Sequence, residues 1–210
     1  LKPLTTLEDE KYFTPFLDLS MSLDDERAEE IGRNLKEVYY GKFLKPSKTN
    51  IEGYYYYMSD FEFWHGIQRV VQSRVSSAKK GKTFLYRFDV VGELNFVKKF
   101  TFCDEFPGAE HFADCSYLFN ISLVPPPSIA SKEFENIKKT VAIWTSFAIN
   151  GNPNNEEIGI GEEWITVESG DWPLKCLNIG TEECQFIPLP ETERLDAWNL
   201  VYDKAGVDLY

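Results

Sequence analysis

The sequence has few of the residues that commonly bind metals or form disulfide bonds. It contains 2 histidines and 4 cysteines among 210 residues, and no Cys-x-x-Cys pair. Because no second histidine stands at ligand spacing, a metal site is disfavoured, and no cofactor is expected. Four cysteines are too few for a disulfide scaffold. We therefore expect four free thiols in a reducing compartment, although Cys176 and Cys184 could bridge a short loop. The other two cysteines are Cys103 and Cys115.

Positive charge and long apolar runs are also scarce. The 34 acidic and 22 basic residues give a net charge of -12, which would repel phosphate backbones, so nucleic acid is not an expected partner. No run approaches the roughly 20 apolar residues of a transmembrane helix. The opening Leu1-Lys2-Pro3-Leu4 does not resemble a signal peptide and lacks an initiator methionine. We therefore expect a piece of a longer protein.

Apolar residues are plentiful, and their spacing predicts helices. A content of 43% hydrophobic and 15% aromatic residues allows one sizeable core. Residues 24–40 carry apolar side chains at helical period. Ser59 and Glu62 resemble a capping box that opens a second helix ending near Lys79-Lys80-Gly81. A third helix is expected to run through residues 134–148 and stop at Asn150-Gly151, and a fourth to open near residues 190–192.

Strand signals are fewer. Residues 83–90 are aromatic and β-branched, which predicts a buried strand, and residues 186–189 predict an edge strand because they contain a proline. Residues 41–57 are interpreted as a surface connection, 100–118 as an ordered loop and 159–181 as an irregular surface segment. With no internal repeat and no second domain in view, the chain is expected to form a single partial α/β domain over residues 1–210.

Any acid-base chemistry that uses histidine depends on His65 or His111. His65 lies inside a predicted helix beside Trp64, which favours a structural role. His111 follows the predicted strand in a loop, with small residues before it that allow a tight backbone turn. Taken alone, a loop histidine is more often structural than catalytic. Neighbouring segments strengthen the catalytic interpretation.

Several segments, taken in order, resemble the type-B carboxylesterase and cholinesterase family, and among its members the insect α-esterases. The resemblance covers nearly the whole chain beyond about residue 20. The ordered set is more specific than any one motif, and its members are Met58-Ser-Asp-Phe-Glu-Phe-Trp-His-Gly-Ile67, Phe84-Leu-Tyr-Arg-Phe-Asp89, Gly108-Ala-Glu-His-Phe-Ala-Asp-Cys-Ser-Tyr-Leu-Phe119, Trp144-Thr-Ser-Phe-Ala-Ile-Asn-Gly-Asn-Pro153, Trp172-Pro173 and Arg194-Leu-Asp-Ala-Trp-Asn199.

The resemblance implies the C-terminal part of an α/β-hydrolase fold, made of the last sheet strands and their packing helices. It also implies that His111 is the general base of a Ser-Glu-His triad that cleaves carboxylic esters. Asp114 is then expected to support the His111 loop, and Asp60 to be a buried hydrogen-bonding group.

The chain departs from that family in what it lacks. No Gly-x-Ser-x-Gly elbow occurs in the sequence, and the family's order places the triad glutamate before residue 1. We therefore expect the isolated chain to be inactive and to require the N-terminal portion of the same domain. Glu110 and Phe112, which flank His111, also differ from the usual residues of insect relatives.

An ester substrate needs apolar pocket walls, for which Phe61, Phe63 and Phe96 are the candidates. Their alternative role is to fill the core. The alternative function for the whole protein is a non-catalytic esterase-like binding or adhesion protein. The sequence does not determine the cellular compartment, although we favour the cytoplasm.

Overall fold

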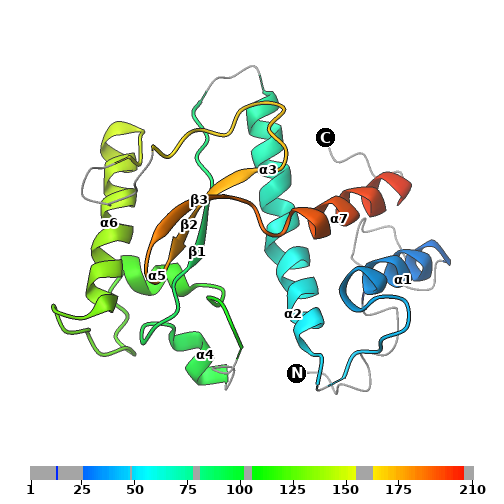
Figure 1. Cartoon of the computed structure of the whole chain (residues 1–210), viewed down its shortest axis with the longest axis horizontal. Coiled ribbons are helices and arrows are strands. Elements are labelled where there is room, and N and C mark those ends of the chain that lie inside the picture. The colour runs from blue at the N-terminus through cyan, green and yellow to red at the C-terminus, as the bar shows by residue number, and fades with distance from the viewer. Residues whose placement is uncertain are drawn as a thin grey trace. The chain divides into compact units, whose positions relative to one another are not determined.

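The computed structural model describes residues 13, 26–47, 49–77, 81–101, 106–154 and 163–205. The chain divides into two compact units (Figure 1). One unit comprises Leu1–Ser77 with Pro190–Tyr210, and we call it the helical unit. The other comprises Ala78–Leu189 and contains the strands, so we call it the sheet unit.

The helical unit is built from α1 (Glu26–Tyr40), α2 (Glu52–Ser59), a π-helical segment (Asp60–Trp64), α3 (His65–Ser76) and α7 (Thr192–Ala205). The residues at both junctions of the π-helical segment keep helical backbone angles, so α2 to α3 form one continuous helical run. The capping role predicted for Ser59 is wrong, because its hydroxyl donates to the Tyr55 carbonyl over 2.8 Å within the helix. Helix therefore replaces the last part of the expected surface connection.

Aromatic and aliphatic side chains from α1, α2 and α7 form the core of the helical unit. Leu35 and Trp198 are fully buried, and Tyr57 is 2% exposed. Stacking of Tyr57 on Trp198 at 5.8 Å joins α2 to α7. The C-terminal helix was predicted correctly.

Asp60 lies at the centre of a buried polar network in the helical unit. Its carboxylate accepts a hydrogen bond from Tyr39 over 2.7 Å and pairs with Arg194 at 2.6 Å. The Trp198 indole donates to the Tyr39 hydroxyl over 2.6 Å. Because Asp60 is fully buried, these partners offset the cost of removing its charge from water. The prediction of a buried hydrogen-bonding aspartate is confirmed.

The sheet unit contains three strands in the order β1-β2-β3, formed by β1 (Tyr86–Asp89), β2 (Lys175–Gly180) and β3 (Cys184–Pro188). Strand β1 pairs in parallel with β2, in the register Phe88 to Ile179, and β2 pairs antiparallel with β3. The strand predicted over residues 83–90 is shorter than expected and half-buried. Residues 175–180 were wrongly assigned to an irregular segment. The edge position of the last strand is confirmed.

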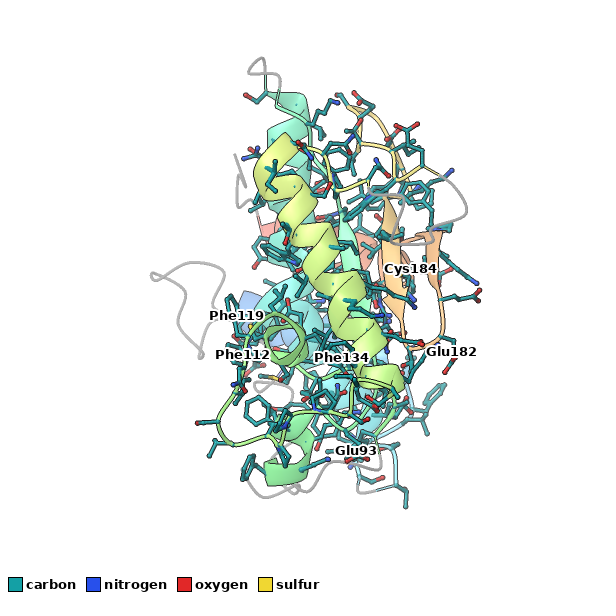
Figure 2. All side chains as sticks on the ribbon, turned by 90° about the vertical axis from the view of Figure 1, so that its left-hand side faces the viewer. Glu93, Phe112, Phe119, Phe134, Glu182 and Cys184 are labelled. Atoms are coloured by element: carbon teal, nitrogen blue, oxygen red, sulfur yellow. The ribbon has the colours of Figure 1, made fainter. Side chains whose placement is uncertain are left out.

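The long helix α6 (Lys132–Asn150) packs against the sheet, and Figure 2 shows it running obliquely beside β2 and β3. Ser131 caps its start by accepting a hydrogen bond from the Phe134 amide over 3.2 Å. Gly151 ends it with φ = +65°, the left-handed conformation that glycine adopts without steric cost. The helix and its stop were predicted correctly. Ile143 of α6, Leu177 of β2 and Tyr117 contribute to the buried core of this unit.

Two short helices, α4 (Phe96–Thr101) and α5 (Ala113–Leu118), follow β1. An ordered loop was predicted over residues 100–118, and this range contains the whole of α5 and the last two residues of α4. That prediction is therefore wrong for the segments that these helices occupy. Each helix is only 6 residues long, too short to show helical periodicity in the sequence.

Cys115, Cys176 and Cys184 are not joined by disulfide bonds. The alternative of a bridge between Cys176 and Cys184 is therefore wrong, and Cys103 lies outside the described residues. Within the described ranges, no helix is long and apolar enough to cross a membrane. No group of metal-binding side chains was found in the same ranges.

Candidate active site

His111 occupies an exposed turn directly before α5 in the sheet unit, in the segment that joins α4 to α5. The turn closes with a hydrogen bond from the Ala113 amide to the Glu110 carbonyl over 3.2 Å. Phe112, directly before α5, has φ = +77°, a conformation that costs energy for a residue with a side chain. The ring centroids of His111 and Phe112 lie 6.2 Å apart. The turn thus presents the imidazole towards solvent.

The segment that leads into this turn is fixed by a buried lysine. Lys98 of α4 is 7% exposed, and its ammonium group donates to the carbonyls of Phe106 and Gly108. Gly108 has φ = +79°, so the tight turn expected from the small residues before His111 is confirmed. A glycine is suited to this position because the left-handed region penalises other residues.

Asn95 connects the end of β1 to the residue before His111. This side chain is 3% exposed. Its amide nitrogen donates to the Val90 carbonyl over 3.0 Å and to the Glu110 carboxylate over 2.7 Å, and its oxygen accepts from the Gly92 amide over 2.7 Å. One buried side chain therefore joins the strand end, the following turn and the His111 turn.

The helix that follows His111 is anchored to the sheet by a tyrosine hydroxyl. Tyr86 of β1 donates to the Asp114 carboxylate over 3.2 Å, as expected for an aspartate that supports the loop. Burial, reinforced by Asp114, raises the pKa of Tyr86 above its usual value. Burial likewise raises the pKa of Tyr117, with Glu133 and Glu110 adding to the effect. Both hydroxyls therefore stay protonated at neutral pH and remain hydrogen-bond donors.

The three aromatic residues predicted to line a substrate pocket lie in different units. Phe61 is half-buried and packs against both Tyr57 and Trp198 in the helical unit, with its ring centroid 6.0 Å from each of theirs. Phe63 belongs to the same unit and is 38% exposed. Phe96 begins α4 in the sheet unit, where its ring meets that of Phe100 edge-on at 6.1 Å. The sheet unit therefore holds two of the four candidate residues, His111 and Phe96.

His65, the second histidine, has the structural position expected of it. It is 5% exposed, packs against Tyr202 at 4.7 Å and shares a hydrogen bond of 3.1 Å with Asn199. Burial lowers its pKa. An enclosed imidazole of this kind is not available to a substrate, so His111 is the histidine suited to proton transfer.

Sequence reasoning missed Asn95 and Lys98 as residues that hold the site. Asn95 stands three residues after Gly92, a spacing typical of a turn closed by a side chain. That spacing was the available signal for Asn95. Nothing in the sequence distinguishes Lys98 from the solvated lysine beside it, Lys99, since its role arises only from the path of the neighbouring loop.

Comparison with known proteins gives a family match. Residues 4–198 match the model of the carboxylesterase family. The chain is 31% identical to Esterase B1 of Culex pipiens over 190 residues, which cover 90% of the chain and 34% of the relative. It is 28% identical to the juvenile hormone esterase of Tribolium castaneum over 156 residues, which cover 69% of the chain and 26% of the relative. A human bile salt-activated lipase is 27% identical over 129 residues, which cover 60% of the chain and 16% of the lipase.

The chain thus spans about a third of Esterase B1 and about a quarter of the juvenile hormone esterase. The family match extends across both units, and the mixed sheet with its packed helices agrees with the α/β fold that the family implies. This chain belongs to the carboxylesterase family.

Proposed function

We propose that the whole protein carrying this chain hydrolyses carboxylic esters through a Ser-Glu-His triad, and that His111 is its general base. In this proposal residues 1–210 form the C-terminal portion of one α/β-hydrolase domain. The imidazole takes the proton of a serine hydroxyl as it attacks the ester, and returns it to the leaving alcohol. His111 then activates a water molecule in the same way, and this water hydrolyses the acyl-serine and releases the carboxylic acid.

The observation that carries this proposal is the way His111 is held. The ring is exposed, yet the turn around it is tied to β1 and its end through Asp114 and Asn95, and to α4 through Lys98. A general base needs a fixed position within hydrogen-bond reach of the reacting group, because small displacements lower the rate strongly. An exposed ring on an anchored turn meets this requirement.

The remaining parts of the triad must come from another segment. The sequence has no Gly-x-Ser-x-Gly elbow, and the chain covers about a third of Esterase B1. Strand β1 lies at one edge of the described sheet, where its outer backbone groups can pair with a further strand. We propose that the N-terminal portion of the domain adds there, and that the isolated chain has no esterase turnover.

Phe61, Phe63 and Phe96 remain our proposal for the apolar walls of the ester pocket. Phe63 is the best suited in the helical unit, since a 38% exposed ring has surface left to contact a substrate. Phe61 already stacks on Tyr57 and Trp198, so its effect on a substrate would be smaller.

The proposal is tested with a fluorescent organophosphonate, which labels an activated serine. The whole protein should be labelled, and His111→Gln should react far more slowly while keeping its thermal unfolding temperature. The 210-residue chain alone should give no signal. Absence of labelling in the folded whole protein would favour the alternative of a non-catalytic esterase-like binding protein.

A further inference from the structure

The turn that carries His111 directs its acidic side chains towards the protein. Glu110 accepts a hydrogen bond from the buried Asn95 over 2.7 Å, and its other carboxylate oxygen is buried as well. Asp114 accepts a hydrogen bond from Tyr86 over 3.2 Å. Both carboxylates next to the imidazole are therefore held by partners in the sheet unit, and the exposed surface beside the imidazole comes from another residue.

That residue is Phe112, which is 50% exposed. Its ring centroid lies 6.2 Å from that of His111, and the two ring planes are inclined by 59°. Figure 2 labels Phe112 beside the short helix α5, which begins at the next residue. The ring is not part of the buried core of the sheet unit. It therefore forms an apolar surface directly next to the imidazole.

The backbone conformation of Phe112 is not explained by packing. Its φ of +77° costs energy for a residue with a side chain. A ring that stays half exposed recovers only part of this cost through burial. Strained backbone of this kind is concentrated at active sites and ligand contacts. The combination of strain and exposure beside His111 therefore points to a role of the ring in contacting a substrate.

The direction of proton transfer indicates which part of an ester would meet this ring. The general base returns its proton to the leaving alcohol, so the alcohol oxygen must come within about 3 Å of the imidazole. The carbonyl oxygen is instead bound by the donors of the oxyanion hole. The group attached to the alcohol oxygen therefore begins beside His111, where the ring of Phe112 is within its reach.

We propose that Phe112 determines specificity by contacting the alcohol part of the ester, and that the whole protein prefers esters of apolar alcohols larger than methanol. This inference rests on the proposed function, because it takes His111 as the general base. An apolar alcohol chain covers the exposed ring and is removed from water in the same step. Phe112 transfers no proton, so it acts on the choice of ester and not on the acid-base chemistry.

The test compares three esters with the whole protein. Hexyl acetate and methyl heptanoate are isomers that carry their long chain on opposite sides of the ester bond, and methyl acetate has no long chain on either side. The kcat/KM of each long ester is divided by that of methyl acetate, which gives an alcohol preference and an acyl preference. In the wild-type protein the alcohol preference should be about tenfold or more.

Phe112→Ala should lower the alcohol preference about tenfold and leave the acyl preference within about twofold of the wild type. A displaced imidazole or a loss of stability would instead lower the rates of all three esters alike. Phe112→Leu, which keeps an apolar side chain, should retain most of the alcohol preference. The matched control Phe119→Ala removes a ring that is 68% exposed at the other end of α5, and it should change neither preference.

The outcomes separate this inference from the proposed function. If the whole protein hydrolyses the esters and Phe112→Ala leaves both preferences unchanged, or lowers them equally, the role of Phe112 is excluded while the proposed function stands. If the folded protein hydrolyses none of the three esters, this inference is overturned, and labelling by the organophosphonate then decides whether the proposed function fails as well.

Discussion

The side-chain amide of Asn95 donates to the carboxylate of Glu110 over 2.7 Å, so a buried residue just beyond the first strand holds the residue that precedes His111. The same amide group also binds the Val90 carbonyl and the Gly92 amide. The position of His111 thus depends on a side chain far from it in sequence, through contacts that join the strand end to the turn.

Replacing Asn95 with alanine should lower the free energy of unfolding by roughly 2 kcal/mol, since it leaves buried backbone groups and Glu110 without partners. Urea denaturation measures this change. Asn120→Ala, at an exposed asparagine of the same unit, should have no measurable effect. Equal stabilities of the two variants would show that Asn95 does not hold the turn.

Phe112 provides a test of backbone strain beside His111. Phe112→Gly and Phe112→Ala both remove the ring, but only glycine adopts φ = +77° without steric cost. The glycine variant should be more stable than the alanine variant by about 1 kcal/mol. Thermal unfolding of the pair measures the difference, and a more stable alanine variant would contradict the left-handed conformation.

The buried network in the helical unit predicts a large effect at Asp60. Asp60→Ala should destabilise the protein by roughly 3 kcal/mol, because it leaves the Arg194 guanidinium without its carboxylate and removes the partner of Tyr39. Glu93→Ala breaks an exposed pair with Lys99 and should cause no measurable change. Chemical denaturation distinguishes the two, and equal effects would be evidence against the network.

His65 predicts a pH dependence of stability. Burial lowers its pKa in the folded state, so between that value and the ordinary value of about 6.5 the unfolded state binds more protons. Stability should therefore fall as the pH drops below about 6.5. His65→Gln should be less stable at pH 7.5 and should show a weaker loss between pH 7.5 and 5.5. An identical pH slope in both proteins would exclude His65 as the cause.

The helices at 26–40, 132–150 and 192–205 could be predicted because each is long enough to repeat its apolar period, and because Gly151 marks a clear stop. Helix α2 could not be predicted from the sequence. Its four consecutive tyrosines obscure the period, and Ser59 offers a capping signal that the structure does not use. The strand β2 was missed because its pairing with β1 joins residues 91 positions apart, as between Phe88 and Ile179.

For the candidate site, the histidine and the tight turn at Gly108 were accessible from the sequence, since both are local features. The anchors Asn95 and Lys98 were not, because their importance comes from tertiary hydrogen bonds to loop carbonyls and to Glu110.

The most direct test of the central claim compares His111→Gln with the wild-type whole protein in ester hydrolysis, with substrate in excess and folding checked by thermal unfolding. If His111 is the general base, kcat should fall about 100-fold to 10,000-fold with an unchanged unfolding temperature. A variant that folds normally and keeps wild-type kcat would contradict the assignment.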